Sequence, residues 1–203
     1  MSLKAKSIGS AGSAVDCILI SGATNATPIV ITVAANSGLK SGDRLAIAGI
    51  TGNTAANGEW TLAAVSATTF QLLGSVGNGT YGGTPRAAQI FDQTPTMRSH
   101  SGVLALAGNL VGTLTLTAFE SYAEFSANDN SLLGAVTAPV VSSAVQGVTN
   151  TNATSASSSA KATSALVIGA TNAGAEYEIK FPKYLHATVS AYTSGTISGN
   201  VQA

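Results

Sequence analysis

Short apolar runs, separated by turn residues, follow one another along the whole chain. In the first half they lie at residues 29–33, 45–48, 60–65 and 69–73, and several place large side chains at every second position. Gly, Asn and Ser separate the runs, and Asn57-Gly58 between two of them is a strong hairpin signal. This spacing predicts four or five antiparallel strands in a small barrel or sandwich.

The second half continues the period of two and predicts a β-sandwich of about 100 residues. Aromatic residues at 119–125 fall on alternate sides of an extended segment, and residues 136–148 could add further strands. Sustained helical spacing with caps is missing from every window, so we expect an all-β protein. The clearest strand candidates are residues 102–106, 112–117, 165–168, 176–181, 185–192 and 195–198.

Changes in composition along the chain predict four parts. A mixed segment with Pro85 and Pro95 is typical of a linker, and the stretch at 150–164 lacks aromatic and large aliphatic residues. Such a Ser/Thr/Ala-rich loop is expected to be exposed, and in an oligomer it could lie along a neighbour. The predicted parts are an N-terminal arm and first strand (1–28), a small antiparallel β-barrel (29–84), a linker (85–99) and a β-sandwich (100–203) that contains the loop.

Charge is unusually scarce in this 203-residue chain. Nine basic and nine acidic residues cancel, and charged residues make up 9% of the sequence, against about 25% in an average soluble domain. A nucleic-acid partner would call for a basic surplus, and a spanning helix would need about 18 apolar residues in a row. We therefore expect neither a nucleic-acid nor a membrane partner. The first residues also lack the apolar region of a signal peptide, which favours synthesis in the cytoplasm.

Candidate reactive residues are few and scattered. The lone Cys17 excludes an internal disulfide and lies in an apolar run at 15–20 that predicts a buried strand. His100 and His186 fit no metal-ligand spacing, and His186, in an alternating strand, is expected at the surface or at an interface. A Gly-x-Ser-x-Gly nucleophile elbow is also missing.

The remaining chemical candidates have simpler structural interpretations. Glu120, Glu124 and Asp129 form the one local acidic group, but positions 120 and 124 of a strand lie about 13 Å apart, beyond the separation used in glycoside hydrolysis. Trp60 is expected in the core with its N–H bonded. The glycines at 77–79 and 82–83 suit hairpin turns, because the helix and Lys of a phosphate loop are missing. The sequence thus predicts no catalytic, cofactor-binding or metal residue and no enzyme.

One part of the sequence resembles a known family. Residues 52–60, Gly-Asn-Thr-Ala-Ala-Asn-Gly-Glu-Trp, together with 34–50, 67–75 and 77–83, resemble a small β-barrel module that recurs in tailed-bacteriophage virion and tail proteins. That module is similar to the first catalytic-cysteine half-domain of ubiquitin-activating enzymes. The resemblance covers residues 29–83 and implies the barrel fold. It does not imply ubiquitin activation, because a nucleotide loop is missing and Cys17 lies outside the module.

A second segment, residues 184–196, is similar to the closing strands of β-sandwich domains in phage head and tail proteins, with His186 where Arg is frequent. Together the two resemblances imply a virion structural protein, most concretely a capsid decoration or cement protein that binds and stabilises the assembled head. The implied partners are the major capsid protein or other virion proteins and further copies in a homo-oligomer such as a trimer, with no cofactor. The implied location is the virion, after synthesis in the host cytoplasm.

An alternative from another class stays open. A tail or tail-fibre component that recognises host-surface glycans is compatible with the same folds. It would need exposed aromatic residues, and aromatic residues make up only 5% of the chain. An enzyme such as a depolymerase has the least support.

Overall fold

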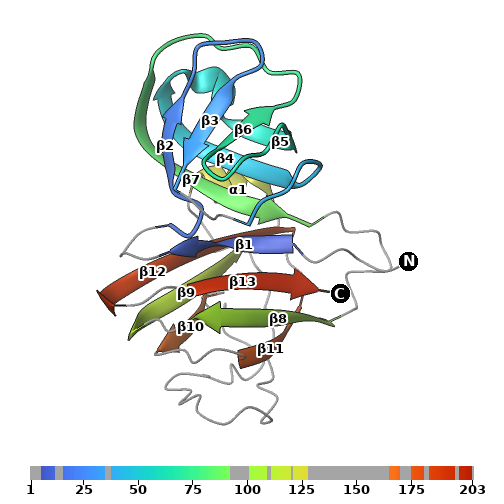
Figure 1. Cartoon of the computed structure of the whole chain (residues 1–203), viewed down its shortest axis with the longest axis vertical. Helices are drawn as coiled ribbons and strands as arrows, with labels where there is room; N and C mark the ends of the chain where they lie inside the picture. Colours follow the sequence, from blue (N-terminus) through green and yellow to red (C-terminus); the bar gives the residue numbers. More distant parts are fainter. Residues whose placement is uncertain are drawn as a thin grey trace.

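The all-β class is confirmed by a computed structural model (Figure 1). The structure describes residues 6–11, 16–34, 38–91, 101–108, 111–119, 121–127, 165–169, 175–180, 183–194 and 197–202. In these residues the only helices are the short 3-10 helix η1 (Thr54–Ala56) and the α-helix α1 (Tyr122–Ala127). None of the described helices is long and apolar enough to cross a membrane.

The described part of the chain contains thirteen strands. In chain order they are β1 (Lys6–Ala11), β2 (Ile20–Ala23), β3 (Val30–Val33), β4 (Arg44–Gly52), β5 (Gly58–Ala63), β6 (Thr69–Leu72), β7 (Tyr81–Ile90), β8 (Ser101–Gly108), β9 (Val111–Phe119), β10 (Ala165–Gly169), β11 (Ala175–Lys180), β12 (Tyr184–Ser194) and β13 (Ile197–Gln202).

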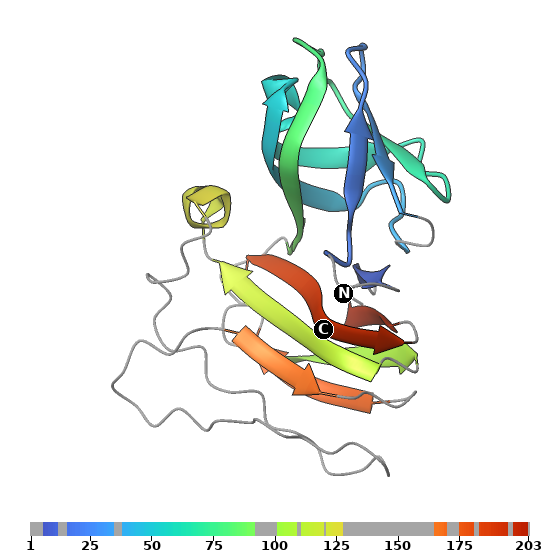
Figure 2. The same ribbon diagram turned by 90° about the vertical axis from the view of Figure 1, so that its left-hand side faces the viewer.

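Antiparallel pairing joins the strands into two sheets. The larger has nine strands in the order β10-β9-β12-β7-β4-β5-β6-β3-β2, and the smaller has the order β1-β13-β8-β11. The nine-stranded sheet is open, so a closed barrel is not confirmed. We call residues 16–91 the N-terminal lobe, and β1, β8–β13 and α1 the C-terminal lobe; Figure 2 shows the two lobes from the side.

Strand β7 joins the lobes where the sequence predicts a linker. Its earlier residues pair with β4, and its last two, Gln89 and Ile90, also pair with β12. The expected linker at 85–99 therefore begins inside a strand, and residues 92–100 lie outside the described residues. Pro85 is tolerated here because it falls at an irregularity in the register, where a missing backbone N–H costs little.

Strand β4 explains how one sheet serves two cores. The alternation of large and small residues at 45–48 places Leu45 and Ile47 in the core of the N-terminal lobe. Ala46 and Ala48 face the opposite way and pack with Phe119, Phe125 and Tyr184 under α1. All four residues of this run are buried, so β4 is a two-faced central strand, and the small side chains leave room for aromatic rings.

The motif at residues 52–60 closes the turn between β4 and β5. The Asn57 side chain accepts a hydrogen bond from the Ile50 amide (3.0 Å) and donates one to the Ile50 carbonyl (2.8 Å). Trp60 donates its ring N–H to the Ala56 carbonyl (2.9 Å) and packs against the core, as expected. The antiparallel β4–β5 pair is confirmed. Its turn is wider than the two-residue turn that Asn57-Gly58 indicates, because η1 lies within it.

The extended segment expected at 119–125 is wrong in its second half. Residues Tyr122–Ala127 form helix α1, and the Ser121 hydroxyl accepts a hydrogen bond from the Glu124 amide (3.2 Å). This is the N-terminal half of a Ser-x-x-Glu capping box, in which a side-chain oxygen satisfies an amide that the first turn leaves unpaired. The helix turns Phe125 inward, fully buried.

The expected strand at 15–20 is also corrected. Asp16 forms an isolated bridge with Thr188, Cys17 follows in a turn, and β2 starts only at Ile20. The Cys17 amide still donates a hydrogen bond to the Ala187 carbonyl of β12 (2.9 Å), so this turn lies against that strand. The expected strands at 136–148 and the loop at 150–164 lie outside the described residues.

Candidate functional site

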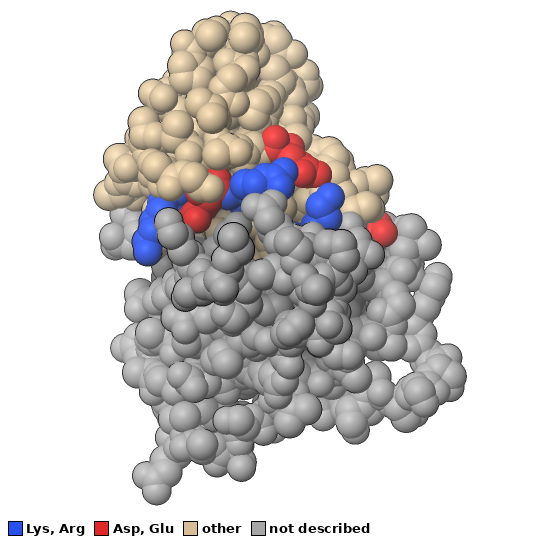
Figure 3. Space-filling model, turned by 90° about the vertical axis from the view of Figure 1, so that its right-hand side faces the viewer, with Lys and Arg blue, Asp and Glu red and all other residues tan. Residues whose placement is uncertain are grey.

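Charged side chains gather where the N-terminal lobe meets the C-terminal lobe. On the face shown in Figure 3 they lie along this border, and the rest of the N-terminal lobe on that face carries none. The sequence explains this, because Glu59 is the only charged residue between Arg44 and Arg86. We refer to Arg44, Glu59, Lys183 and Tyr184 as the junction cluster.

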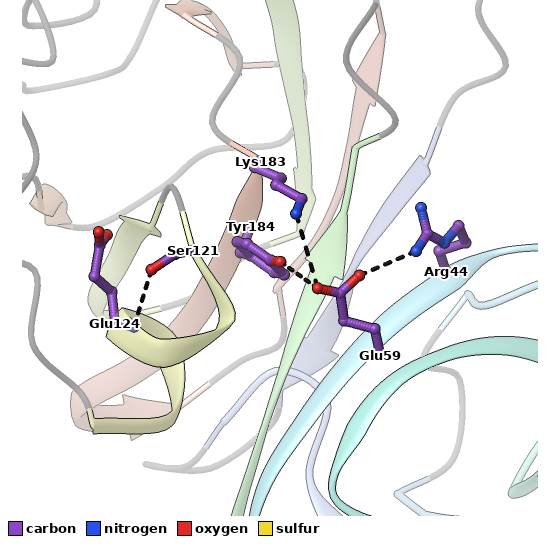
Figure 4. A network of polar contacts seen from close by, with 6 residues as sticks. All are labelled: Arg44, Glu59, Ser121, Glu124, Lys183 and Tyr184. Atoms are coloured by element: carbon purple, nitrogen blue, oxygen red, sulfur yellow. Dashed lines mark hydrogen bonds and ion pairs between the residues drawn. The ribbon is translucent and has the colours of Figure 1, made fainter.

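Glu59 is the centre of the junction cluster (Figure 4). It extends from β5 and receives a hydrogen bond from the Tyr184 hydroxyl, at 2.5 Å to Oε1. Its other oxygen lies 3.0 Å from an Arg44 guanidinium nitrogen, and Lys183 Nζ lies 3.8 Å from Oε1. One carboxylate thus joins β5 and β4 to β12 across the border between the lobes.

Tyr184 is held in its neutral form. Burial raises the pKa of its hydroxyl well above the ordinary value, and the hydrogen bond to Glu59 raises it further. Its ring is fully buried, stacks on Phe125 with the centroids 6.4 Å apart, and has Lys183 Nζ 5.0 Å from its centroid. A tyrosine in this state is a hydrogen-bond donor and not a nucleophile or a base.

Helix α1 is fastened to the large sheet beside the junction cluster. One Arg86 guanidinium nitrogen donates hydrogen bonds to the carbonyls of Phe125 (2.8 Å) and Ser126 (2.9 Å) at the end of the helix. The guanidinium carbon also lies 5.5 Å from the centre of the Phe125 ring. Tyr122 donates its hydroxyl to the Ile47 carbonyl (2.8 Å). Burial lowers the pKa of Arg86, and the nearby charge of Asp16 opposes that shift.

His186 lies inside the protein, whereas the sequence predicts it at the surface or at an interface. Its side chain is buried, with Nε2 3.2 Å from an Asp16 oxygen and the ring edge-on to Phe125 at 6.2 Å. The Nε2–Asp16 approach does not have hydrogen-bond geometry. The position follows from strand alternation, because His186 points to the same side of β12 as Tyr184. His186 and Asp16 therefore pack the lobe border.

Cys17 is inert in this environment. Its side chain is 2% exposed, and burial raises the pKa of the thiol to about 12, with the charge of Asp16 adding to the shift. Its amide donates a hydrogen bond to the Ala187 carbonyl (2.9 Å). Since the thiolate is the reactive form, this confirms the interpretation of Cys17 as a small buried apolar residue.

The other residues considered from the sequence do not converge. Glu124 lies on α1, while Glu120, Asp129 and His100 fall outside the described residues, so their mutual distances are not defined. In the described part of the chain, no group of three or more His, Cys, Asp or Glu side chains could hold a metal ion. Gly77 and Asn78 lie in the connection between β6 and β7, where Asn78 bonds neighbouring loops.

The geometry of the junction cluster fits a structural role better than a catalytic one. The Glu59 carboxylate is engaged by a hydroxyl and two cations, and the Tyr184 hydroxyl keeps its proton. A general base needs free access to a substrate proton, and a nucleophile needs a lowered pKa or a neighbouring base. These groups satisfy one another, and the arrangement holds the two lobes together.

The contacts of the junction cluster were not predicted from the sequence, although one sequence feature pointed to Glu59. Glu59 is the only charged residue in the long stretch between Arg44 and Arg86, which marks it out in the sequence. The Ser-x-x-Glu pattern at 121–124 could have identified α1 in the same way. The identity of the partner of Glu59 was not accessible, because Tyr184 is 125 residues away along the chain.

Comparison of the chain with protein-family models, with curated proteins and with solved structures gives no match.

Proposed function

We propose that this chain is a bacteriophage virion structural protein, most concretely a capsid decoration or cement protein that binds and stabilises the assembled head. Its partners would be the major capsid protein or other virion proteins and further copies of itself, and it would act by binding and not by catalysis. The resemblances at residues 29–83 and 184–196 support the virion setting.

The observation that carries the proposal is the distribution of charge. The described ionisable groups of the junction cluster engage one another at the lobe border, and the face of the N-terminal lobe beyond that border is uncharged (Figure 3). An uncharged surface adds no long-range repulsion when many copies pack side by side on a shell. Binding across capsomer junctions would then favour the assembled state by mass action.

The experiment is to purify particles of the phage that encodes the chain, quantify the chain by mass spectrometry, and locate it by cryo-electron microscopy. We expect many copies per particle on the outside of the head, and heads that lack the chain should release DNA at a lower temperature. Absence from purified particles would overturn the proposal. Density confined to the tail would favour the alternative, a tail component that recognises host glycans.

A further inference from the structure

The sequence contains two Asn-Gly pairs, at residues 57–58 and 78–79. This dipeptide is prone to deamidation, because the asparagine side chain is chemically labile and glycine has no Cβ to shield its backbone nitrogen. The two pairs lie close together in the fold, since the Asn78 side chain is hydrogen-bonded to Thr54 and Ala55, just before Asn57. The pairs therefore share one chemistry and one region, and they differ in the partners of their side chains.

The Asn57 side-chain amide is held at both ends by one residue. Its oxygen accepts a hydrogen bond from the Ile50 amide (3.0 Å), and its nitrogen donates one to the Ile50 carbonyl (2.8 Å). The next residue, Gly58, begins β5 and pairs with Ile47 of β4. An amide that is bonded at both ends cannot turn its carbon toward the Gly58 nitrogen, so the folded chain opposes the reaction between them.

The β4–β5 turn depends on both members of this labile pair. Gly58 has φ +135°, a backbone conformation that residues with a side chain rarely adopt. Asn57 supplies the side chain that bonds both backbone groups of Ile50. A bulkier residue after Asn57 would slow deamidation, but it would strain the turn.

We propose that Asn57 is a deamidation site of the unfolded chain, and that a chain modified there cannot rebuild the β4–β5 turn. In the reaction, the Gly58 nitrogen attacks Cγ of Asn57 and its proton passes to the leaving group. The Cγ–Nδ2 bond breaks and ammonia is released. Water then opens the cyclic imide and leaves aspartate or isoaspartate at position 57. The inference concerns the chain by itself and does not depend on the virion role.

The partner of Asn57 does not tolerate the aspartate product. An ionised carboxylate has no donor, and one of its oxygens would face the Ile50 carbonyl oxygen, which the amide nitrogen contacts at 2.8 Å. Two acceptors at this separation repel each other in a part-buried site, and the Ile50 carbonyl loses its donor. Isoaspartate also lengthens the backbone of the turn by one carbon.

Asn78 provides the internal comparison. Its side-chain oxygen accepts a hydrogen bond from the Ala55 amide (3.0 Å), and its nitrogen donates one to the Thr54 hydroxyl (3.0 Å). A hydroxyl can rotate and donate as well as accept, so an aspartate at position 78 would keep both contacts. The same dipeptide thus has a tolerated aspartate product at position 78 and a disruptive one at position 57.

The first test compares deamidation of the purified full chain in buffer and in urea that unfolds it, at one mildly alkaline pH, by peptide mapping with mass spectrometry. We expect Asn57 to react at least about tenfold more slowly in buffer, because the folded chain must first open locally. The matched control is Leu73→Asn, which creates an Asn-Gly pair at an exposed position of the turn at 73–74. This new pair should react in buffer nearly as fast as in urea.

Equal rates at Asn57 in buffer and in urea would overturn the proposal. Equal protection of the new pair in Leu73→Asn would overturn it as well, because protection would then not come from the bonds to Ile50.

The second test examines the product with the variants Asn57→Asp and Asn78→Asp. We expect Asn78→Asp to have a urea midpoint close to that of the unmodified chain. Asn57→Asp should unfold at a clearly lower urea concentration or fail to fold. Equal midpoints of the two variants would show that the Ile50 carbonyl does not exclude the aspartate product, and the proposal would be wrong.

Discussion

At the scale of single residues, one carboxylate determines how the lobes meet. Glu59 accepts a hydrogen bond from Tyr184 and pairs with Arg44 and Lys183. Exposed ion pairs contribute little to stability because water screens them, and the three charged side chains of this cluster, Arg44, Glu59 and Lys183, are about a third exposed. The hydrogen bond from the buried Tyr184 is therefore the contact of this cluster that we expect to stabilise the junction most.

The substitution Tyr184→Phe tests this contact. It removes the hydroxyl and keeps the stacked ring, and we expect it to lower the free energy of unfolding by about 1.5–3 kcal/mol, the usual contribution of a hydrogen bond to a charged group. The measurement is urea denaturation at neutral pH, followed by circular dichroism.

The difference in the free energy of unfolding between the unmodified chain and Tyr184→Phe should change with pH in a definite direction. Because the pKa of Tyr184 is raised in the folded state, the unfolded chain loses this proton first as pH rises. The contribution of the Tyr184 hydroxyl to stability is therefore complete below about pH 10, the ordinary pKa of tyrosine, and is lost progressively as the pH rises above it. The stability gap between the unmodified chain and Tyr184→Phe should therefore narrow above pH 10. A gap that stays constant or widens would contradict the assignment.

At the scale of elements, the loops of the N-terminal lobe depend on one another. Gly52, at the end of β4, has φ +74°, and a Cβ there would lie 2.1 Å from the Thr80 carbonyl oxygen. Gly74 has a similar φ of +78°, but a Cβ there would meet no atom within 4 Å. The two glycines share the left-handed backbone and differ in how closely a neighbouring loop approaches.

Alanine at each glycine separates these two causes. Gly74→Ala should lower the free energy of unfolding by about 1–2 kcal/mol, the usual penalty for a residue with a side chain in the left-handed conformation. Gly52→Ala should lower the free energy of unfolding clearly more, because the backbone at Thr80 has to move as well. Urea midpoints of the two variants provide the comparison. Equal losses would show that the close approach to Thr80 contributes nothing.

At the scale of the whole molecule, the two lobes share one sheet. Strand β7 pairs with β4 in the N-terminal lobe and with β12 in the C-terminal lobe, and α1 packs over both. Neither lobe can therefore unfold without breaking a ladder and a core that it shares with the other. This differs from two modules on a linker, which could unfold separately.

We accordingly expect a single cooperative unfolding transition. Trp60 is the only tryptophan and lies in the N-terminal lobe, so its fluorescence reports on that lobe, while far-ultraviolet circular dichroism reports on both. The two signals should give coincident curves in urea, as two-state behaviour requires. An earlier transition of either signal would show that the lobes unfold independently.

Some of these features were predictable from local sequence and others were not. The strand at 69–72 could be located because alternation and turn residues are local properties. Residues 119–125 also alternate, but there the capping serine and the space beside Ala46 and Ala48 favour a helix. His186 was expected at the surface or at an interface, but its side chain is buried because β12 is covered on both faces from Tyr184 to Ala187, which a period of two does not reveal.

By itself, then, the sequence determined the all-β class, most strand positions and the scarcity of charge between Arg44 and Arg86, since each depends on neighbouring residues or on composition. Only the tertiary structure decided that β7 merges the lobes, that α1 covers the second core, and that Glu59 binds Tyr184. These features join residues far apart in the chain, and their energies come from burial and pairing that exist only once the sheets have formed.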